Sequence, residues 1–323
     1  MQFDEAVKAF VAGYFSTCKR SKKTQSAYQI DMVQLRSYVG AVTPLADIGP
    51  SVLEAWAADL RKDGYAPVSI RRKFATTKVF FGYWVRKGAL DKSPLWRIRL
   101  DLGRDRILPR SLTPADARRF MEEAWRDSEL TVSQMRNPAD HGFLRLRNIA
   151  ALEILFATGM RVGELVNLSL QDWREDERTF VVLGKGSRQR LAFLPDDRSV
   201  RAVELYMTSR RAMDLGHDAL FVNFSGRQIS TQGISRVVAE TATSAELAHR
   251  VTPHMIRHTV ATLLLRYGAD IRIVQEVLGH SSIATTQRYT HVSKEHLFTA
   301  LRAQHPNHHL NINWATPQVP VER

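Results

Sequence analysis

Four side chains towards the end of the chain have types and spacings that could act together in a reaction. His254 and Arg257 are three residues apart, which places them on one face of a helix. His280 follows a glycine at the end of an apolar segment, and Tyr289 lies nine residues further along. Arginine binds anionic oxygens, histidine transfers protons near neutral pH, and tyrosine is a nucleophile once it loses its proton. Each residue also has an ordinary structural interpretation, such as packing for the tyrosine. A shared role in catalysis therefore requires that the fold bring the four side chains together.

Two further cations precede this set. Arg161 follows the apolar stretch 149–156, which we expect to form a buried helix, so its side chain has a rigid support that suits a ligand clamp. Lys185 lies between two glycines at the tip of a predicted hairpin, where its ammonium can swing into a groove. The structural alternatives are a helix-capping arginine paired with Glu164 and a solvated lysine.

A metal site is not expected. His254 and His258 have the i, i+4 spacing of a zinc pair, but Met255 stands where the corresponding metalloprotease helix carries its glutamate. Cys18 is the only cysteine, so the sequence excludes an intrachain disulfide and a cysteine-based zinc site.

Helix start and stop signals place these residues on a mainly helical scaffold from about residue 113 to 305. Thr113-Pro114 and Thr252-Pro253 each combine a threonine N-cap with a proline at the first helical position. Gly159 and Gly279 are expected to end helices. The one clear interruption is a hairpin of two strands, residues 179–183 and 190–194.

Residues 1 to about 90 predict a separate helical domain, because apolar side chains recur there with helical periodicity. The expected helices cover residues 3–15, 28–39, 53–60 and 68–85. The first 110 residues hold 20 Lys and Arg against 10 Asp and Glu, which is ten of the thirteen net positive charges of the chain. The densest clusters comprise Lys19, Arg20, Lys22, Lys23, Arg71, Arg72 and Lys73. A solvated face is the usual explanation for such clusters, but two of them beside helix starts favour contact with phosphates.

The composition fits a soluble globular protein with a polyanionic partner. Of the 323 residues, 44% are hydrophobic and 24% are charged, and the net charge of +13 favours nucleic acid, with a merely basic protein as the alternative. The acidic start of the chain lacks the features of a signal peptide, and no apolar run reaches the roughly 18 residues that span a bilayer. We therefore expect a cytoplasmic protein with no membrane partner.

Four segments follow from these signals. We expect an N-terminal helical DNA-binding domain over residues 1–92, a basic linker over 93–112, a catalytic domain over 113–305 and a flexible C-terminal tail over 306–323.

In this order and spacing, the candidate residues resemble the catalytic signature of the tyrosine recombinase, or lambda-integrase, family. That signature is an arginine, a lysine, a His-x-x-Arg element, a histidine and a tyrosine, and the resemblance extends over nearly the whole chain. The stretch 290–297, after the tyrosine, is especially similar to the Xer-type branch. The resemblance implies a mainly α fold, in which a helical core-binding (SAM-like) domain precedes a mostly helical catalytic domain with a small β-sheet.

The resemblance also assigns roles. The nucleophile is Tyr289, the paired arginines are Arg161 and Arg257, the hairpin lysine is Lys185, and the two histidines are His254 and His280. Glu164 is the acid three residues after the first arginine, and we expect it to orient the cations. Attack on a DNA phosphate would give a 3′-phosphotyrosyl link, and because that link keeps the phosphodiester energy, no ATP, metal or other cofactor is expected.

The partners that the family implies are double-stranded DNA with paired inverted half-sites and a homo-tetramer on two such sites, acting through a Holliday junction. Residues 293–304 form a candidate helix that docks either on a neighbouring protomer or on its own domain. A type IB topoisomerase and a catalytically inactive DNA-binding relative are the rival interpretations. The sequence leaves open the target site, the biological role, and the need for an accessory DNA-bending protein or a second recombinase.

Overall fold

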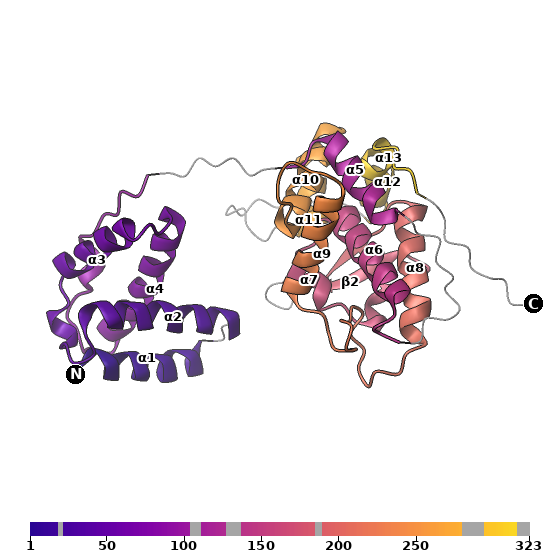
Figure 1. Ribbon diagram of the computed structural model, residues 1–323. Coiled ribbons are helices and arrows are strands. Elements are labelled where there is room, and N and C mark those ends of the chain that lie inside the picture. The colour runs from indigo at the N-terminus through magenta and orange to yellow at the C-terminus, as the bar shows by residue number, and fades with distance from the viewer. Residues whose placement is uncertain (19–21, 104–110, 127–136, 185–188, 280–293, 315–323) are drawn as a thin grey trace, which may run out of the picture. The chain divides into compact units, whose positions relative to one another are not determined.

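A computed structural model of the chain describes residues 1–18, 22–103, 111–126, 137–184, 189–279 and 294–314 (Figure 1). The chain divides into two compact units, Met1–Ile107 and Leu108–Arg323, each with its own hydrophobic core. In the described part of the chain, no helix is both long enough and apolar enough to cross a membrane.

The first unit is built from the four helices that the periodicity predicts. They are α1 (Phe3–Thr17), α2 (Lys22–Val39), α3 (Pro50–Lys62) and α4 (Pro67–Arg86), with short 3-10 turns at Leu45–Asp47 and Pro94–Trp96. Helix α2 begins six residues before the predicted residue 28, because the polar residues at its start give no apolar periodicity. The end of α3 is closed by a Schellman motif around Gly64. Gly64 has a φ of +80°, and the N–H groups of Gly64 and Tyr65 donate to the carbonyls of Arg61 and Leu60.

The predicted linker is shorter in the structure. Leu95, Ile98, Leu100 and Leu102 pack on the core of the first unit, whereas Leu112 belongs to the core of the second. The prolines and arginines of residues 93–112 indicate a linker, but the leucines and the isoleucine that alternate with those arginines bind much of this stretch to the first core.

The second unit is mainly helical, as predicted, with one small sheet. Its helices are α5 (Pro114–Trp125), α6 (His141–Thr158), α7 (Val162–Val166), α8 (Asp197–Arg211), α9 (Thr231–Ser244), α10 (Pro253–Arg266), α11 (Ile271–Leu278), α12 (Lys294–Gln304) and α13 (Pro306–His309). Its strands are β1 (Trp173–Arg174), β2 (Thr179–Leu183) and β3 (Gln189–Phe193), which form an antiparallel sheet in the order β1-β2-β3. The predicted hairpin is therefore confirmed, with its second strand one residue earlier than expected.

Helix α6 is the centre of this unit (Figure 1). From Ile149 to Thr158 every side chain is buried, because α5, α7, α8, α9, α10 and β3 all pack against the helix. Gly159 ends α6 in the left-handed conformation, with a φ of +58°. The predicted buried helix and its glycine stop are confirmed.

Threonine-proline starts position two of the helices that pack on α6. The hydroxyl of Thr113 accepts the N–H of Asp116 at 3.1 Å, and the hydroxyl of Thr252 accepts the N–H of Met255 at 3.2 Å. Each threonine is followed by proline at the first helical position, as predicted.

The segment after residue 305 is not the flexible tail that the sequence suggested. Asn307, Leu310 and Ile312 are buried, and the ring of Trp314 lies 5.2 Å from the ring of Trp125. Prolines and weak periodicity indicate a tail, but the short helix α13 and the residues after it are held by burial. Residues 315–323, the rest of the predicted tail, lie outside the described residues.

Helix α12 packs on its own unit. Leu301 is buried, and the ring of Phe298 stacks on Phe193 of β3 with 4.2 Å between centroids. These contacts lie within one chain.

Candidate active site

The first predicted catalytic arginine begins a short helix directly after α6. Arg161 is the N-cap of α7, and its backbone N–H donates to Oε2 of Glu164 at 3.0 Å. Its guanidinium Nη1 bonds to Oε1 of the same carboxylate at 2.8 Å, while its side chain remains 41% exposed. Arg161 can therefore both cap α7 and bind a ligand, because a guanidinium has five N–H donors and the pairing with Glu164 occupies only one of its nitrogens.

The second arginine is buried and ties two helix ends together. Arg257, on α10, donates from Nη1 to the carbonyl of Gly159 and from Nη2 to the carbonyl of Leu278, each at 2.8 Å. These carbonyls lie at the C-terminal ends of α6 and α11, where the helix dipoles favour a cation. Arg257 therefore fixes the end of α11 against the end of α6.

A third arginine joins the pair, and nothing in the sequence pattern indicated it. Arg190, on β3, donates from Nη2 to Oε2 of Glu164 at 2.8 Å and from Nη1 to the carbonyl of Val277 at 3.1 Å. Its side chain is 13% exposed. In sequence it is one cation in a strand, and only its position against Glu164 and α11 distinguishes it.

The two helix-ending glycines of the site have no room for a side chain. A Cβ on Gly159 would lie 2.6 Å from Cδ2 of Leu278, and a Cβ on Gly279 would lie 2.6 Å from Nε of Arg190. Both have positive φ angles, +58° and +63°, which L residues with side chains rarely adopt. The close approach of α6, α11 and β3 requires glycine at both positions.

Three guanidiniums thus surround one carboxylate, which leaves a surplus of two positive charges. Burial, followed by the charge of Arg161, lowers the pKa of Arg257 to about 10, with Glu164 opposing the shift and Arg190 adding to it. Burial alone would raise the pKa of Glu164, but the backbone N–H of Arg161, the charge of Arg190 and the side-chain hydrogen bonds of both arginines outweigh burial and lower it. At neutral pH all four groups are charged, so the cluster Arg161, Glu164, Arg190 and Arg257 can bind an anion.

Comparison with known proteins identifies this arrangement. The sequence model of the phage integrase family matches residues 128–296, and the model of the phage integrase N-terminal SAM-like domain matches residues 7–88. The chain belongs to the phage integrase family. Tyrosine recombinase XerC of Corynebacterium efficiens is 36% identical over 306 residues, which are 94% of this chain and 92% of the relative. Tyrosine recombinase XerD of Halalkalibacterium halodurans is 35% identical over 293 residues, 88% of this chain and 92% of the relative.

Solved structures agree with the fold. The XerH recombinase in a post-cleavage complex with a palindromic difH substrate superposes with a TM-score of 0.67 at 21% identity, covering 92% of this chain and 83% of that one. A lambda integrase tetramer bound to a Holliday junction gives 0.66 at 18% identity, covering 90% and 80%. The protein is a tyrosine-type site-specific recombinase, and the predicted fold class, with its SAM-like and catalytic domains, is confirmed.

The structure describes only part of the predicted catalytic set of this recombinase. Arg161, Glu164 and Arg257 lie together, and His254 lies exposed in the first turn of α10. Lys185, His280 and Tyr289 lie outside the described residues, as do Lys19 and Arg20.

The predicted DNA-binding cluster on α4 divides into two kinds of residue. Lys73 is 3% exposed and its ammonium bonds to Gln34 and, at 3.4 Å, to the buried carboxylate of Asp31. Its role is structural, because the ammonium is needed to balance a buried charge. Arg71 and Arg72 are exposed, although Arg72 also pairs with Asp31 at 2.6 Å. Lys22 and Lys23 begin α2, and nothing is described of their side chains.

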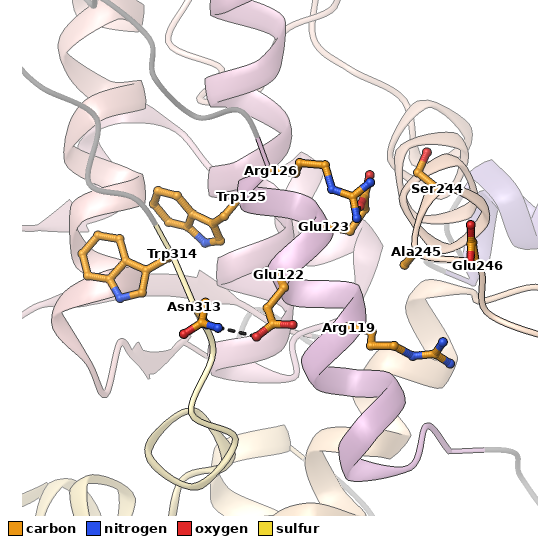
Figure 2. A pocket seen from close by; sticks show the side chains of 10 residues that line it. All are labelled: Arg119, Glu122, Glu123, Trp125, Arg126, Ser244, Ala245, Glu246, Asn313 and Trp314. Atoms are coloured by element: carbon orange, nitrogen blue, oxygen red, sulfur yellow. Dashed lines mark hydrogen bonds and ion pairs between the residues drawn. The ribbon is translucent and has the colours of Figure 1, made fainter.

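A cavity of about 680 Å³ lies in another part of the second unit, between α5, the end of α9 and the C-terminal segment. Figure 2 shows Glu122 of α5 facing Asn313, whose N–H donates to that carboxylate at 3.2 Å. None of the predicted catalytic residues that the structure describes lines this cavity. The cationic cluster therefore remains the candidate active site.

Proposed function

We propose that this recombinase cleaves and rejoins duplex DNA by forming a covalent bond between a DNA phosphate and Tyr289. The observation that carries the proposal is the cationic cluster. Attack on a phosphodiester adds negative charge to the non-bridging oxygens, and preorganised cations stabilise that charge most. Arg257 is held by two carbonyls and Arg161 by one carboxylate, so neither guanidinium needs to reorganise during the reaction.

The bond changes balance without a cofactor. The hydroxyl oxygen of Tyr289 attacks the phosphorus, the bond from phosphorus to the 5′-oxygen breaks, and the products are a 3′-phosphotyrosyl link and a free 5′-hydroxyl. In this proposal His254 accepts the tyrosine proton, Lys185 protonates the leaving oxygen, and His280 donates a hydrogen bond to the phosphate. The 5′-hydroxyl of another strand then attacks the phosphotyrosyl bond and releases Tyr289.

We further propose that the protein acts as a homo-tetramer on two DNA sites with inverted half-sites. Support comes from the lambda integrase structure, which is a tetramer on a Holliday junction. The exposed arginines of α4 would contact backbone phosphates, which predicts a steep fall in affinity between about 50 and 200 mM salt. An affinity that hardly changes over this range would contradict the phosphate contacts.

Covalent capture from genomic DNA tests the reaction and recovers the target site in the same experiment. The purified chain is mixed with sheared genomic DNA of its source, denatured with detergent, and the DNA that remains attached is sequenced. We expect one enriched sequence with inverted half-sites, attached through its 3′-phosphate. Tyr289→Phe should abolish attachment, and Tyr267→Phe, a matched change at the end of α10, should preserve it.

Two outcomes would overturn the proposal. Attachment that survives Tyr289→Phe would exclude this residue as the nucleophile. A site that is nicked and relaxed without exchange of its flanking sequences would instead support a topoisomerase-like reaction.

A further inference from the structure

We propose that Arg190 is a positioning residue for the recombination reaction, acting by holding Glu164 and the end of α11 in one arrangement. The inference rests on the proposed function and goes beyond it, because Arg190 is outside the catalytic set that the sequence predicts. It is carried by two hydrogen bonds from one guanidinium to two separate elements.

The contacts of Arg190 connect three segments of the catalytic unit. Its backbone is on β3, opposite Val182 of β2, in the hairpin whose turn contains Lys185. Its Nη2 reaches Glu164 of α7, and its Nη1 reaches Val277 at the end of α11. Arg257 links the same end of α11 to α6, through Leu278 and Gly159. The two arginines together hold the described segments that adjoin Arg161, Lys185 and His280.

Arg190 is closely packed in this position. The Nε atom is buried and has no hydrogen-bond partner among the described residues. Gly279 lies against it so closely that a Cβ there would be 2.6 Å from Nε. Because Nε is buried without a partner in the described part of the chain, the bonds to Glu164 and to the Val277 carbonyl hold the guanidinium in place. Losing the first of these bonds would also leave the Glu164 carboxylate short of a partner.

Charge is the second part of the argument. Without Arg190, the carboxylate of Glu164 would keep only Arg161 as a direct ionic partner among the described residues, and Arg257 would lose one of the two cations that repel it. Lysine would restore the charge beside Glu164, but its single ammonium cannot hold both Glu164 and the Val277 carbonyl in the geometry of the planar guanidinium. Arg190→Lys is therefore expected to restore part of the function that Arg190→Gln removes.

The test measures binding and covalent attachment separately. The probe is a nicked duplex carrying the sequence recovered by covalent capture, and the variants are Arg190→Gln, Arg190→Lys and a matched control, Arg174→Gln. Arg174 is also a strand arginine of this sheet, but it is exposed and pairs with its neighbour Glu177 at 3.4 Å. We expect Arg190→Gln to slow attachment by about 10- to 100-fold, as loss of an orienting partner does at other sites, with unchanged duplex affinity. Arg190→Lys should be intermediate, and the control should match the wild type.

A double-mutant cycle separates positioning from general weakening of the fold. If Arg190 acts through Glu164, adding Glu164→Gln to Arg190→Gln should slow attachment much less than the product of the single effects. Wild-type attachment in Arg190→Gln, fully multiplicative effects, or parallel loss of affinity and attachment would each overturn the inference. A wild-type chain that forms no Tyr289-dependent adduct would instead overturn the proposed function, so the two failures are distinguishable.

Discussion

Two clusters of charged residues adjoin α6, one around Glu153 within the helix and one beyond its C-terminal end, and they are balanced in different ways. In the inner cluster Glu153 is fully buried, and it accepts hydrogen bonds from Arg198 at 2.7 Å and from Trp125 at 2.6 Å. Asp196 adds a second carboxylate, 3.6 Å from Arg198. Two carboxylates there share one guanidinium, and the protein itself supplies their partners.

The cationic cluster described above has the opposite composition, with three guanidiniums around Glu164. Exposure rises from the buried Arg257 through Arg190 at 13% to Arg161 at 41%, so the surplus positive charge opens to solvent on one side. The inner cluster is complete within the protein, whereas the cationic cluster is complete only with an anion. This difference separates a structural charge network from a binding one more reliably than the presence of charged residues alone.

Removing the guanidinium of the inner cluster should have the largest effect on stability. Arg198→Met would leave Glu153 as an uncompensated buried charge, and we expect a loss of about 3–5 kcal/mol in unfolding free energy. Urea unfolding at pH 7 would measure it. Arg198→Met combined with Glu153→Gln should recover much of the loss, since the amide still accepts the Trp125 hydrogen bond. Failure of the second change to recover stability would show that this cluster does not act through charge.

The corresponding change in the cationic cluster should affect chemistry. Arg257→Lys keeps one charge but loses the paired contacts to two carbonyls, and we expect covalent attachment to slow by about 10²–10³. Attachment to the nicked duplex measures the effect, with Arg198→Lys as the control from the inner cluster. If both substitutions slowed attachment equally in the folded protein, the distinction between the clusters would be wrong.

Low pH should lower the stability of the second unit through His305, which lies beside Asp196 of the inner cluster. Its Nε2 lies 2.8 Å from the carbonyl of Ala157 and its Nδ1 accepts the N–H of Asn307, so the buried imidazole is neutral and burial lowers its pKa. The unfolded chain takes up a proton near pH 6.5, so this contribution is complete above that pH and falls by about 1.4 kcal/mol per unit below it. Asp196, whose pKa is also lowered, titrates below this window.

Urea unfolding at pH 7.5 and 5.0 tests this dependence. We expect the wild type to lose about 2 kcal/mol more than His305→Gln between these pH values. Equal losses in the two chains would show that His305 does not control the acid sensitivity.

Binding of inorganic phosphate should have the smallest effect on stability, and it tests directly whether the cationic cluster binds an anion. At ten times its dissociation constant, phosphate bound to the cationic cluster would add about 1.4 kcal/mol of stability, or about 3 °C in the melting temperature of the second unit. Arg161→Gln should remove the shift, and Arg201→Gln, a partly exposed arginine of α8, should retain it. Chloride at equal ionic strength is the reference, and an equal shift in both variants would indicate a general salt effect.

Local signals allow much of the fold to be predicted from the sequence. The Thr252-Pro253 start, the Gly159 and Gly279 stops and the β2–β3 hairpin depend on residues within a few positions of one another. The same applies to the His254-x-x-Arg257 element, whose two side chains are one helical turn apart.

Apart from the start of α2, which polar residues conceal, the main errors concern contacts between distant residues. Arg190 acquires its position from Glu164 and from Val277, 26 and 87 residues away. The buried ammonium of Lys73 pairs with Asp31, 42 residues earlier in the sequence, and His305 bonds to the carbonyl of Ala157, 148 residues earlier. Composition and periodicity contain no information about such pairings, so they cannot distinguish these residues from ordinary surface side chains or from the start of a flexible tail.

The two crowded glycines of the site set a boundary for engineering this recombinase towards other DNA sequences. At Gly159 and Gly279 both the backbone conformation and the neighbouring side chains exclude a larger residue. A Cβ on Gly163, in the same short helix as Glu164, would lie more than 4 Å from every described residue other than its chain neighbours and the backbone of its own helix, and the φ of Gly163 is one that other residues adopt. Libraries for altered specificity can therefore include position 163, while positions 159 and 279 must stay unchanged in every member.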